Sequence, residues 1–393
     1  MKQTYTTMKK ILPLVVAIVL MSISCNKDVP EPVAKTFPKY SGSTIGTLIS
    51  DNANYSILKS ALTRAGLLTA LQDTDKQYTL FAPDNAAFTA SGISQEIVNV
   101  LPLEQLTPAL LYHVVPQKVM SSQIPSTFPN LQYPSLLNPA PNLSSLLRLA
   151  TFPTTSNGAW VNNVPIKAVN TEASNGVIHT VATLIMPPSR FLWDRIDTDA
   201  NLTYLKAAIQ RADSGVASNS LSNLEGLMKN IGANFTVFAP SDDAFKTLLT
   251  GAIYQALVAQ SMPPEQAFPT AQFLASTPAV FSNPALYGAL SAQTVKGIVV
   301  YHVMTSRAFT NNLPATLSNY PTVLNSVVPS HPGLAIQATF GNPLVTAATV
   351  KGAANQTASN ILITMMVPEP AGSSDQHYLN GVLHVIDQVL LPQ

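Results

Sequence analysis

Residues 78–88 read YTLFAPDNAAF, and residues 235–245 read FTVFAPSDDAF. Two further landmarks recur in the same order along the chain. LYHVV at 111–115 is matched by VYHV at 300–303, and NGVIHTV at 175–181 is matched by NGVLHVI at 380–386. Three landmarks that occur twice in one order indicate two copies of a single domain, and a duplication fixes the architecture before any single motif does.

The two copies differ in length. The first occupies about 40–189 and the second 190–393, with Pro187-Pro188 closing the first copy. The second copy carries additional residues within 250–295 and 320–379. Long surface loops add little to the entropy of closing the chain, and such loops often carry function. We therefore expect both insertions at the surface of the second domain.

Local patterns predict helices and strands in each copy. An apolar i, i+3, i+7 spacing opens both copies and is typical of an amphipathic helix, and an alternating strand follows it. Asp84 and Ser241 stand where a helix N-cap is expected. The Asn-Gly pairs at 175–176 and 380–381 predict tight turns ahead of buried strands. Each copy is therefore predicted to have an α+β fold with a helical layer against sheet strands.

The N-terminal residues are typical of an export signal. Residues 1–24 contain Lys9 and Lys10, an apolar run too short to span a membrane, for which about 20 residues are needed, and then Ser24. Cys25 follows, and the segment resembles a bacterial lipobox, whose cysteine becomes the lipidated N-terminus. The alternative is an unmodified cysteine near an ordinary cleavage site. Residues 25–39 are polar and Pro-rich, which favours a tether.

Composition narrows the class of protein. Cys25 is the only cysteine among 393 residues, so an intramolecular disulfide is impossible and stability depends on the core. Charged residues make up 10% of the chain, well below the roughly 25% of an average soluble protein. The net charge of +1 argues against a nucleic-acid partner, which would require a basic stripe.

Together, the FAP-x-x-x-A-F segment, the Tyr-His pair and the NGV-[IL]-H strand resemble the fasciclin (FAS1) domain. The resemblance covers both copies. It implies tandem domains, each a β-sandwich or wedge with helices packed on one edge. It also implies extracellular adhesion and binding of proteins or glycans, without enzymatic activity or a cofactor. The residues that match the family motifs, which we expect to be mainly structural, are Phe81, Pro83, Tyr112, His113, Asn175, Gly176, His179, Phe238, Pro240, Tyr301, His302, Asn380, Gly381 and His384.

The resemblance has limits. In animal members the Tyr-His segment is linked to integrin attachment together with a nearby Asp-Ile element. Neither VVPQKVMSSQI nor VMTSRAFTNNL, which follow the two Tyr-His pairs, contains Asp-Ile. We therefore do not expect integrin binding. The first copy also has Ala182 where the second has Asp387.

The sequence contains only weak indications of a catalytic or metal-binding site. The four motif histidines suggest a paired site for metal binding or base catalysis in each domain. Because they lie within apolar strand-like runs, hydrogen-bonded core histidines are the favoured interpretation. The chain has no G-x-S-x-G or H-E-x-x-H motif for nucleophilic or zinc hydrolysis. Asp194, Asp197 and Asp199 could bind calcium, but without a turn glycine or closing Glu they favour helix capping.

A ligand site is expected in the second domain. Tyrosines offer a flat apolar face with a polar edge, which suits sugar stacking. The candidate contacts in or near the insertions are Tyr287, Tyr320 and Tyr378.

These observations together suggest a lipid-anchored outer-membrane lipoprotein of a Gram-negative, Bacteroidetes-like bacterium. We expect a non-enzymatic protein that binds an extracellular or envelope protein or glycan and has no metal or cofactor. One alternative is a spacer subunit of an outer-membrane complex. The remote alternative is a hydrolase whose site the motifs do not show.

Overall fold

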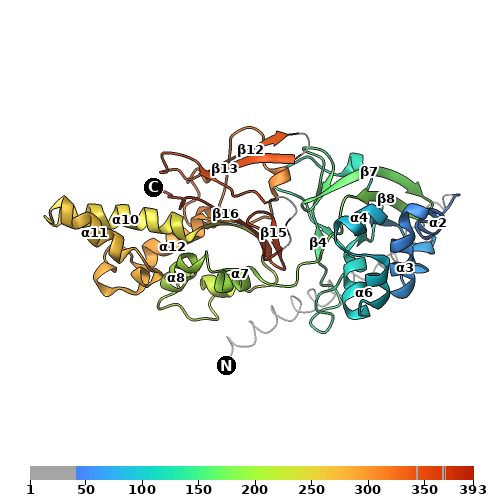
Figure 1. The fold of residues 1–393 in the computed structure, drawn as a ribbon, viewed down its shortest axis with the longest axis horizontal. Coiled ribbons are helices and arrows are strands. Elements are labelled where there is room, and N and C mark those ends of the chain that lie inside the picture. The colour runs from blue at the N-terminus through green and yellow to red at the C-terminus, as the bar shows by residue number, and fades with distance from the viewer. Residues whose placement is uncertain (1–40, 342–343, 365–366, 368) are drawn as a thin grey trace, which may run out of the picture. The chain divides into compact units, whose positions relative to one another are not determined.

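The computed structural model describes residues 41–341, 344–364, 367 and 369–393. The predicted signal peptide, Cys25 and the tether lie outside the described residues. Two domains of mixed helices and strands follow one another along the described chain (Figure 1), which confirms the α+β prediction. Among the described residues, no helix has both the length and the apolar sequence needed to cross a bilayer.

The first domain begins with helices around one central strand and ends in strands. Its α-helices are α2 (Ile45–Asp51), α3 (Ser56–Arg64), α4 (Asn85–Ala90), α5 (Gln95–Val100) and α6 (Leu103–Tyr112), with the 3-10 helices η1 (Ala53–Tyr55), η2 (Ala70–Gln72) and η3 (Ser121–Gln123). Its strands are β1 (Tyr78–Pro83), β2 (Val114–Val115), β3 (Tyr133–Pro134), β4 (Ala150–Thr151), β5 (Pro153–Thr154), β6 (Trp160–Val161), β7 (Val164–Ala173) and β8 (Gly176–Val181). The main sheet has the order β2-β1-β8-β7-β6-β5, and β3 pairs with β4.

The second domain repeats this general order of helices followed by strands. Its α-helices are α7 (Leu192–Thr198), α8 (Thr203–Ala212), α9 (Leu224–Met228), α10 (Asp242–Ala259), α11 (Pro264–Leu274) and α12 (Ala292–Tyr301), with η4 (Pro278–Ser282), η5 (Pro284–Leu286), η6 (Thr310–Asn312) and η7 (Val323–Ser326). Its strands are β9 (Phe235–Pro240), β10 (Val303–Met304), β11 (Ser318–Tyr320), β12 (Leu334–Gly341), β13 (Leu344–Lys351), β14 (Ser359–Asn360), β15 (Gln376–Tyr378) and β16 (Gly381–Ile386). They form two sheets, β10-β9-β16-β15 and β11-β12-β13-β14.

A buried parallel strand pair lies at the centre of each domain. β1 pairs with β8 so that Phe81 is opposite His179, and β9 pairs with β16 so that Phe238 is opposite His384. Every residue of β8 and β16 is buried. Alternate residues of β1 contact different cores: Leu80 packs with the helices, and Phe81 packs with the strand residues on the other side. Side chains cover both faces, which explains why these strands are continuous apolar runs.

The local predictions can be compared directly with these elements. The Asp84 carboxylate accepts the Ala87 N–H at 2.8 Å, and the Ser241 hydroxyl accepts the Ala244 N–H at 3.2 Å, so both predicted N-caps are confirmed. The strand environment assumed for the Tyr-His pairs is wrong. Tyr112 ends α6 and His113 is its C-cap, and the second domain repeats this arrangement at the end of α12.

The residues 250–295 fold largely as helices. α10 spans 18 residues, whereas the short helix α4 that follows β1 in the first domain spans 6. α11 begins at Pro264 and lies beside α10 (Figure 1), and η4 and η5 follow it. Within 320–379, β12 and β13 form an antiparallel hairpin.

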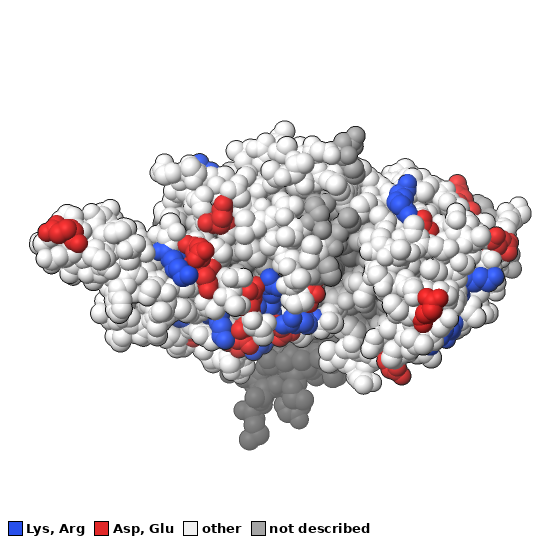
Figure 2. Space-filling view, viewed as in Figure 1, with Lys and Arg blue, Asp and Glu red and all other residues white. Residues whose placement is uncertain are grey.

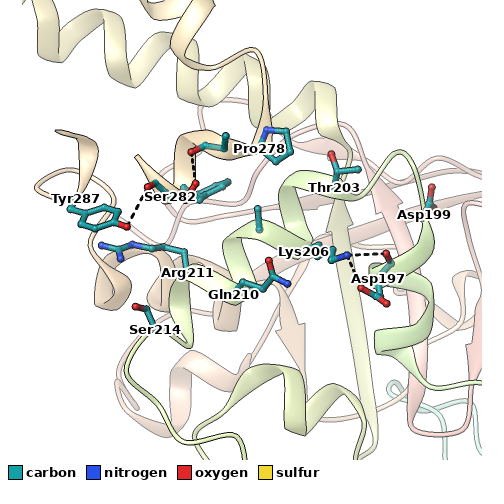
Figure 3. A pocket seen from close by; sticks show the side chains of 13 residues that line it. Asp197, Asp199, Thr203, Lys206, Gln210, Arg211, Ser214, Pro278, Ser282 and Tyr287 are labelled. Carbon is teal, nitrogen blue, oxygen red and sulfur yellow. Dashed lines mark hydrogen bonds and ion pairs between the residues drawn. The ribbon is translucent and has the colours of Figure 1, made fainter. Parts of the chain in front are cut away.

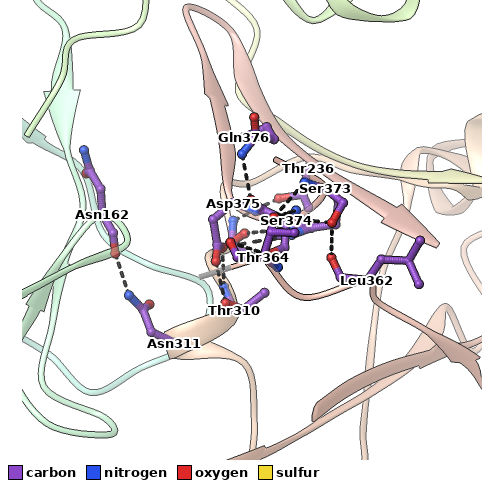
Figure 4. A network of polar contacts seen from close by, with 12 residues as sticks. Asn162, Thr236, Thr310, Asn311, Leu362, Thr364, Ser373, Ser374, Asp375 and Gln376 are labelled. Atoms are coloured by element: carbon purple, nitrogen blue, oxygen red, sulfur yellow. Dashed lines mark hydrogen bonds and ion pairs between the residues drawn. The ribbon is translucent and has the colours of Figure 1, made fainter. Parts of the chain in front are cut away.

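A polar joint connects the two domains. The Asn311 side chain donates to the Asn162 carbonyl at 2.6 Å (Figure 4). Asn312 is 1% exposed, and both polar atoms of its side-chain amide form hydrogen bonds with the first domain. Its Oδ1 accepts from Thr154 at 2.9 Å and Ser156 at 2.7 Å, and its Nδ2 donates to Asn130 Oδ1 at 2.8 Å and to the Thr127 carbonyl at 3.1 Å. Because this buried amide forms all of its hydrogen bonds, it holds the two domains in one orientation at Asn312.

Aromatic side chains surround this joint. Phe152 of the first domain lies 5.8 Å from Phe309 and 6.0 Å from His377 of the second, measured between ring centroids. The Arg307 guanidinium lies 5.1 Å from the centre of the Phe152 ring. Phe128 and Tyr320 meet edge to face at 4.4 Å. Apolar burial and cation–π attraction therefore reinforce the hydrogen bonds.

Candidate functional site

Two of the motif histidines close the ends of helices. His113 Nδ1 donates to the Ala109 carbonyl at 2.7 Å, and its Nε2 accepts the Ile185 N–H at 3.0 Å. His302 repeats both bonds, with the Ile298 carbonyl at 2.8 Å and the Leu390 N–H at 2.8 Å. Each imidazole therefore ties the end of a helix to the C-terminal segment of its own domain.

The other two histidines bind the backbone of residues with a left-handed conformation, one within β7 and one directly before β15. The N–H of Asn170 donates to His179 Nδ1 at 3.2 Å, and the N–H of Asp375 donates to His384 Nδ1 at 3.2 Å. Both donors have left-handed backbone, with φ of 62° and 55°. The Nε2 atoms of the two rings bond to the carbonyls of Val119 and Ala308, both at 2.9 Å.

These contacts leave the histidines without free ring nitrogens. Burial lowers the pKa of His113 and of His302 to about 4, and it also lowers the pKa of His179 and His384. A neutral imidazole with one nitrogen donating and the other accepting has no lone pair left for a metal or a proton. In the part of the chain that the structure describes, no three His, Cys, Asp or Glu side chains group so that they could hold a metal ion. His113 and His179 are 1% and 0% exposed, so they do not open on a pocket as the hydrolase alternative requires.

The remaining motif polar groups also bind backbone. Asn175 Oδ1 accepts the Ile45 N–H at 2.8 Å, and Asn380 Oδ1 accepts the Leu192 N–H at 3.0 Å, so each Asn-Gly turn holds the first helix of its domain. The Tyr112 hydroxyl donates to the Ala150 carbonyl at 2.9 Å, and burial raises its pKa to about 12. The Tyr301 hydroxyl donates to the Gly333 carbonyl at 2.7 Å.

The aspartates considered for calcium are engaged separately. Asp194 Oδ2 accepts the Phe191 N–H at 2.8 Å and caps α7. Asp197 pairs with Lys206 at 2.7 Å, and Asp199 pairs with Arg195 at 2.7 Å. Asp387, which Ala182 replaces in the first copy, accepts from the Asn360 N–H at 2.8 Å and so holds β14.

The three candidate tyrosines are not brought together. Tyr287 lines a pocket in the second domain and is 39% exposed. Tyr320 packs on Phe128 at the joint. Tyr378 is 0% exposed, so no ligand at the surface can reach it in this structure. Tyr287 is thus the candidate whose surroundings can accept a ligand.

The pocket at Tyr287 has a volume of about 570 Å³, within the ~300–1,000 Å³ range of small-molecule sites. It lies between α8 and the turn that contains η4 (Figure 3). Its polar lining includes Asp197, Thr203, Lys206, Gln210, Arg211, Ser214 and Ser282. Pro278, Ala279 and Phe281 supply apolar surface from within the insertion.

The two ends of the pocket differ in chemistry. At one end the Arg211 guanidinium carbon lies 3.6 Å from the centre of the Tyr287 ring. At the other end Lys206 is paired with Asp197, and Gln210 projects between the two ends (Figure 3). The apolar spacing of α8 identified its buried face, but no motif or spacing in the sequence singles out Lys206, Gln210 or Arg211. Only the packing of the insertion over α8 makes these polar residues a pocket wall.

Charge is sparse and mixed on the face shown in Figure 2, where blue and red atoms interleave around α7 and α8. Arg190 pairs with Glu369 at 2.9 Å in this region, beside the Arg195–Asp199 and Lys206–Asp197 pairs. This face therefore has no broad field of one sign for steering a large polyanion.

Comparisons with known proteins agree with the motifs. A family model for the fasciclin domain matches residues 53–187 and 216–392. Protein sll1483 of Synechocystis sp. is 31% identical over 150 residues, which cover 38% of this chain and 76% of that protein. Transforming growth factor-beta-induced protein ig-h3 of Sus scrofa is 30% identical over 169 residues, which cover 42% of this chain but 23% of that protein.

A structural comparison covers both domains at once. A FAS1 domain pair from the insect cell adhesion molecule Fasciclin I is similar to this chain with 16% sequence identity and a TM-score of 0.32. The match covers 87% of this chain and 98% of that chain.

Proposed function

This chain belongs to the fasciclin domain family, and from that premise we propose that it is a non-enzymatic adhesion or binding protein that recognises a glycan or protein through its second domain. The observation that carries the proposal is the pocket at Tyr287, which is built by the insertion that the first domain lacks. The motif histidines do not compete for this role, because backbone groups occupy both nitrogens of each ring.

Membrane attachment is part of the same proposal. We infer that Cys25 carries a lipid and that the protein is held at the outer membrane through the tether at 25–39, with a partner in the envelope or outside the cell. Because a single acyl chain gives only marginal binding, the lipid proposed at Cys25 must contain more than one acyl chain to anchor the protein stably. Mass spectrometry of the N-terminal peptide tests this, and a Cys25→Ser protein that stays membrane-bound in the absence of other partners contradicts it.

The binding test must leave the core intact. Removing residues 250–295 would also remove core residues such as Ile253, Ala271 and Phe281, so a loss of binding would not locate the site. Ala279 is an exposed lining residue, and Ala279→Trp fills the pocket without entering the core. Ala90, exposed at the end of α4 in the first domain, provides the matched control Ala90→Trp.

The measurement is binding of Lys35–Gln393, which contains every described residue, to a panel of glycans and extracellular proteins. We expect a saturable ligand whose affinity falls with Ala279→Trp and is unchanged with Ala90→Trp. Equal affinities in both variants would place the ligand elsewhere. A folded protein that binds nothing would overturn the recognition proposal.

The joint between the domains favours a second candidate, a rigid spacer in an envelope complex. Buried Asn312 and the Phe152–Phe309 contact fix one domain on the other, as a spacer requires. Crosslinking in cells separates the two proposals, because a spacer gives one dominant envelope partner whose recovery does not depend on the pocket.

A further inference from the structure

The pocket at Tyr287 contains one positive charge without a counter-charge. Four charged residues line it: Asp197, Asp199, Lys206 and Arg211. The first three have ion-pair partners within 2.7 Å. Arg211 has no ion pair with any described residue. The unbalanced charge of the pocket is therefore positive, which favours an anionic ligand group.

Arg211 is also held in one orientation. Its Nε donates to the Leu290 carbonyl at 2.9 Å, and its guanidinium plane lies on the Tyr287 ring, whose hydroxyl donates to the Ser282 carbonyl at 3.3 Å. Among the described residues, Nη1 and Nη2 have no hydrogen-bond partner. The hydrogen bond at Nε and the contact with the Tyr287 ring hold the guanidinium in place. Its two free nitrogens then have the spacing that matches the two oxygens of a carboxylate.

The rest of the wall suits hydroxyl groups. Gln210 and Ser214 make no side-chain hydrogen bond to a described residue, so both can bind a ligand. Lys206 and Gln210 lie about 6 Å apart along the axis of α8, which spreads the polar groups along the wall. The Asp197 side chain is 43% exposed, so it can accept further hydrogen bonds. Donors and acceptors spread along one wall, with Pro278 and Ala279 opposite, favour a polyhydroxylated ligand over an apolar peptide side chain.

We propose that this pocket binds an acidic sugar, with the sugar carboxylate on Nη1 and Nη2 of Arg211 and the ring hydroxyls on Gln210 and the Asp197–Lys206 pair. The inference rests on the recognition function proposed above and names its ligand class. Tyr287 acts here as the platform that orients Arg211, so its ring is needed and its hydroxyl is secondary.

The test compares matched ligands on Lys35–Gln393. Uronic-acid oligosaccharides are titrated by calorimetry beside the same oligosaccharides with the carboxyl groups reduced to alcohols, sulfated neutral oligosaccharides and a short peptide ending in a free carboxylate. We expect the uronate ligand to bind best and to weaken with added salt. Arg211→Gln should reduce its affinity about tenfold to a hundredfold, as the loss of a charge-assisted hydrogen-bond pair predicts.

Control variants separate charge, geometry and folding. Arg211→Lys keeps the charge without the fork and should lose most of the affinity, whereas Tyr287→Phe keeps the platform and should bind nearly normally. Arg148→Gln removes an exposed arginine of the first domain and should change nothing. Melting curves identify any variant that fails to fold.

Each outcome has a separate meaning. Equal binding of carboxylated and reduced sugars, or full affinity in Arg211→Gln, overturns the acidic-sugar inference. If a neutral glycan or a protein binds and Ala279→Trp abolishes that binding, the recognition function stands and only its ligand class is wrong. Preference for the peptide carboxylate or the sulfated sugar likewise overturns the sugar carboxylate as the recognised group.

Discussion

At the scale of single residues, each motif histidine supplies one donor and one acceptor to backbone groups far apart in sequence. His302 is the sharpest test, because its Nε2 is the partner of the Leu390 N–H. We expect His302→Ala to lower the free energy of unfolding of the second domain by roughly 1–3 kcal/mol, since a buried N–H loses its acceptor. Denaturant unfolding measures the change, and Gln293→Ala on the exposed side of α12 is the control. An unchanged unfolding curve with lost ligand binding would instead make His302 a functional residue.

Burial of the same histidines predicts a dependence of stability on pH. The pKa of His113 and of His302 is lowered to about 4 in the folded protein, against about 6.5 in an unfolded chain. The unfolded chain therefore binds more protons between these values, so stability is full above about pH 6.5 and declines as the pH falls toward 4.

We expect a slope of up to about 1.4 kcal/mol per pH unit for each histidine in that window. Unfolding midpoints at several values between pH 7.5 and 4.5 measure it, and His302→Ala should show a shallower slope than the unmodified chain. Constant stability from pH 7.5 to pH 5 would show that the folded protein accommodates charged imidazoles.

At the scale of elements, the Asn-Gly turn determines how β8 enters the sheet. Gly176 has φ of 150°, and a Cβ there would lie 1.9 Å from the Tyr78 carbonyl oxygen. Gly176→Ala should therefore displace the parallel pairing of β1 with β8 and destabilise the first domain by more than about 2 kcal/mol, because backbone cannot yield as a flexible side chain can.

Gly251 provides the opposite case in the same chain. It lies exposed inside α10, and a Cβ there meets nothing within 4 Å. Gly251→Ala should stabilise the second domain by about 0.5–1 kcal/mol, since alanine loses less backbone entropy in a helix. Thermal unfolding of Gly176→Ala and of Gly251→Ala measures the two changes in stability. A destabilising Gly251→Ala would show that α10 contacts something beyond this chain.

The elements differ in how far the sequence predicts them. Helix caps at Asp84 and Ser241 and the buried strands after the Asn-Gly turns follow from local rules, and the structure has them there. The position of His113 at a helix end could not be read from its apolar neighbours, because a buried helix end and a buried strand share that pattern. Arg211 and Gln210 become a pocket wall only through packing of the insertion, which no local pattern encodes.

At the scale of the whole molecule, the joint decides whether the two fasciclin domains act as one unit. Its polar centre comes from η6, whose Thr310 N–H is held by Asp375 Oδ1 at 2.7 Å. The same Asp375 donates its N–H to His384. The repeated histidine contact therefore also positions Asn311 and Asn312 against the first domain, so the core of the second domain and the joint share one network.

Asn312 tests that coupling. Replacing it with alanine leaves Thr154, Ser156 and Asn130 without their partner across the joint, at roughly 1–3 kcal/mol for each buried group left unpaired. We expect Asn312→Ala to leave each domain folded but to loosen their connection. Small-angle scattering should then show a broader distribution of interdomain distances, and the two domains should unfold in separate transitions. Asn319→Ala, exposed on β11, is the matched control. An unchanged scattering profile for Asn312→Ala would mean that the Phe152–Phe309 and Phe128–Tyr320 contacts alone are sufficient to hold the joint.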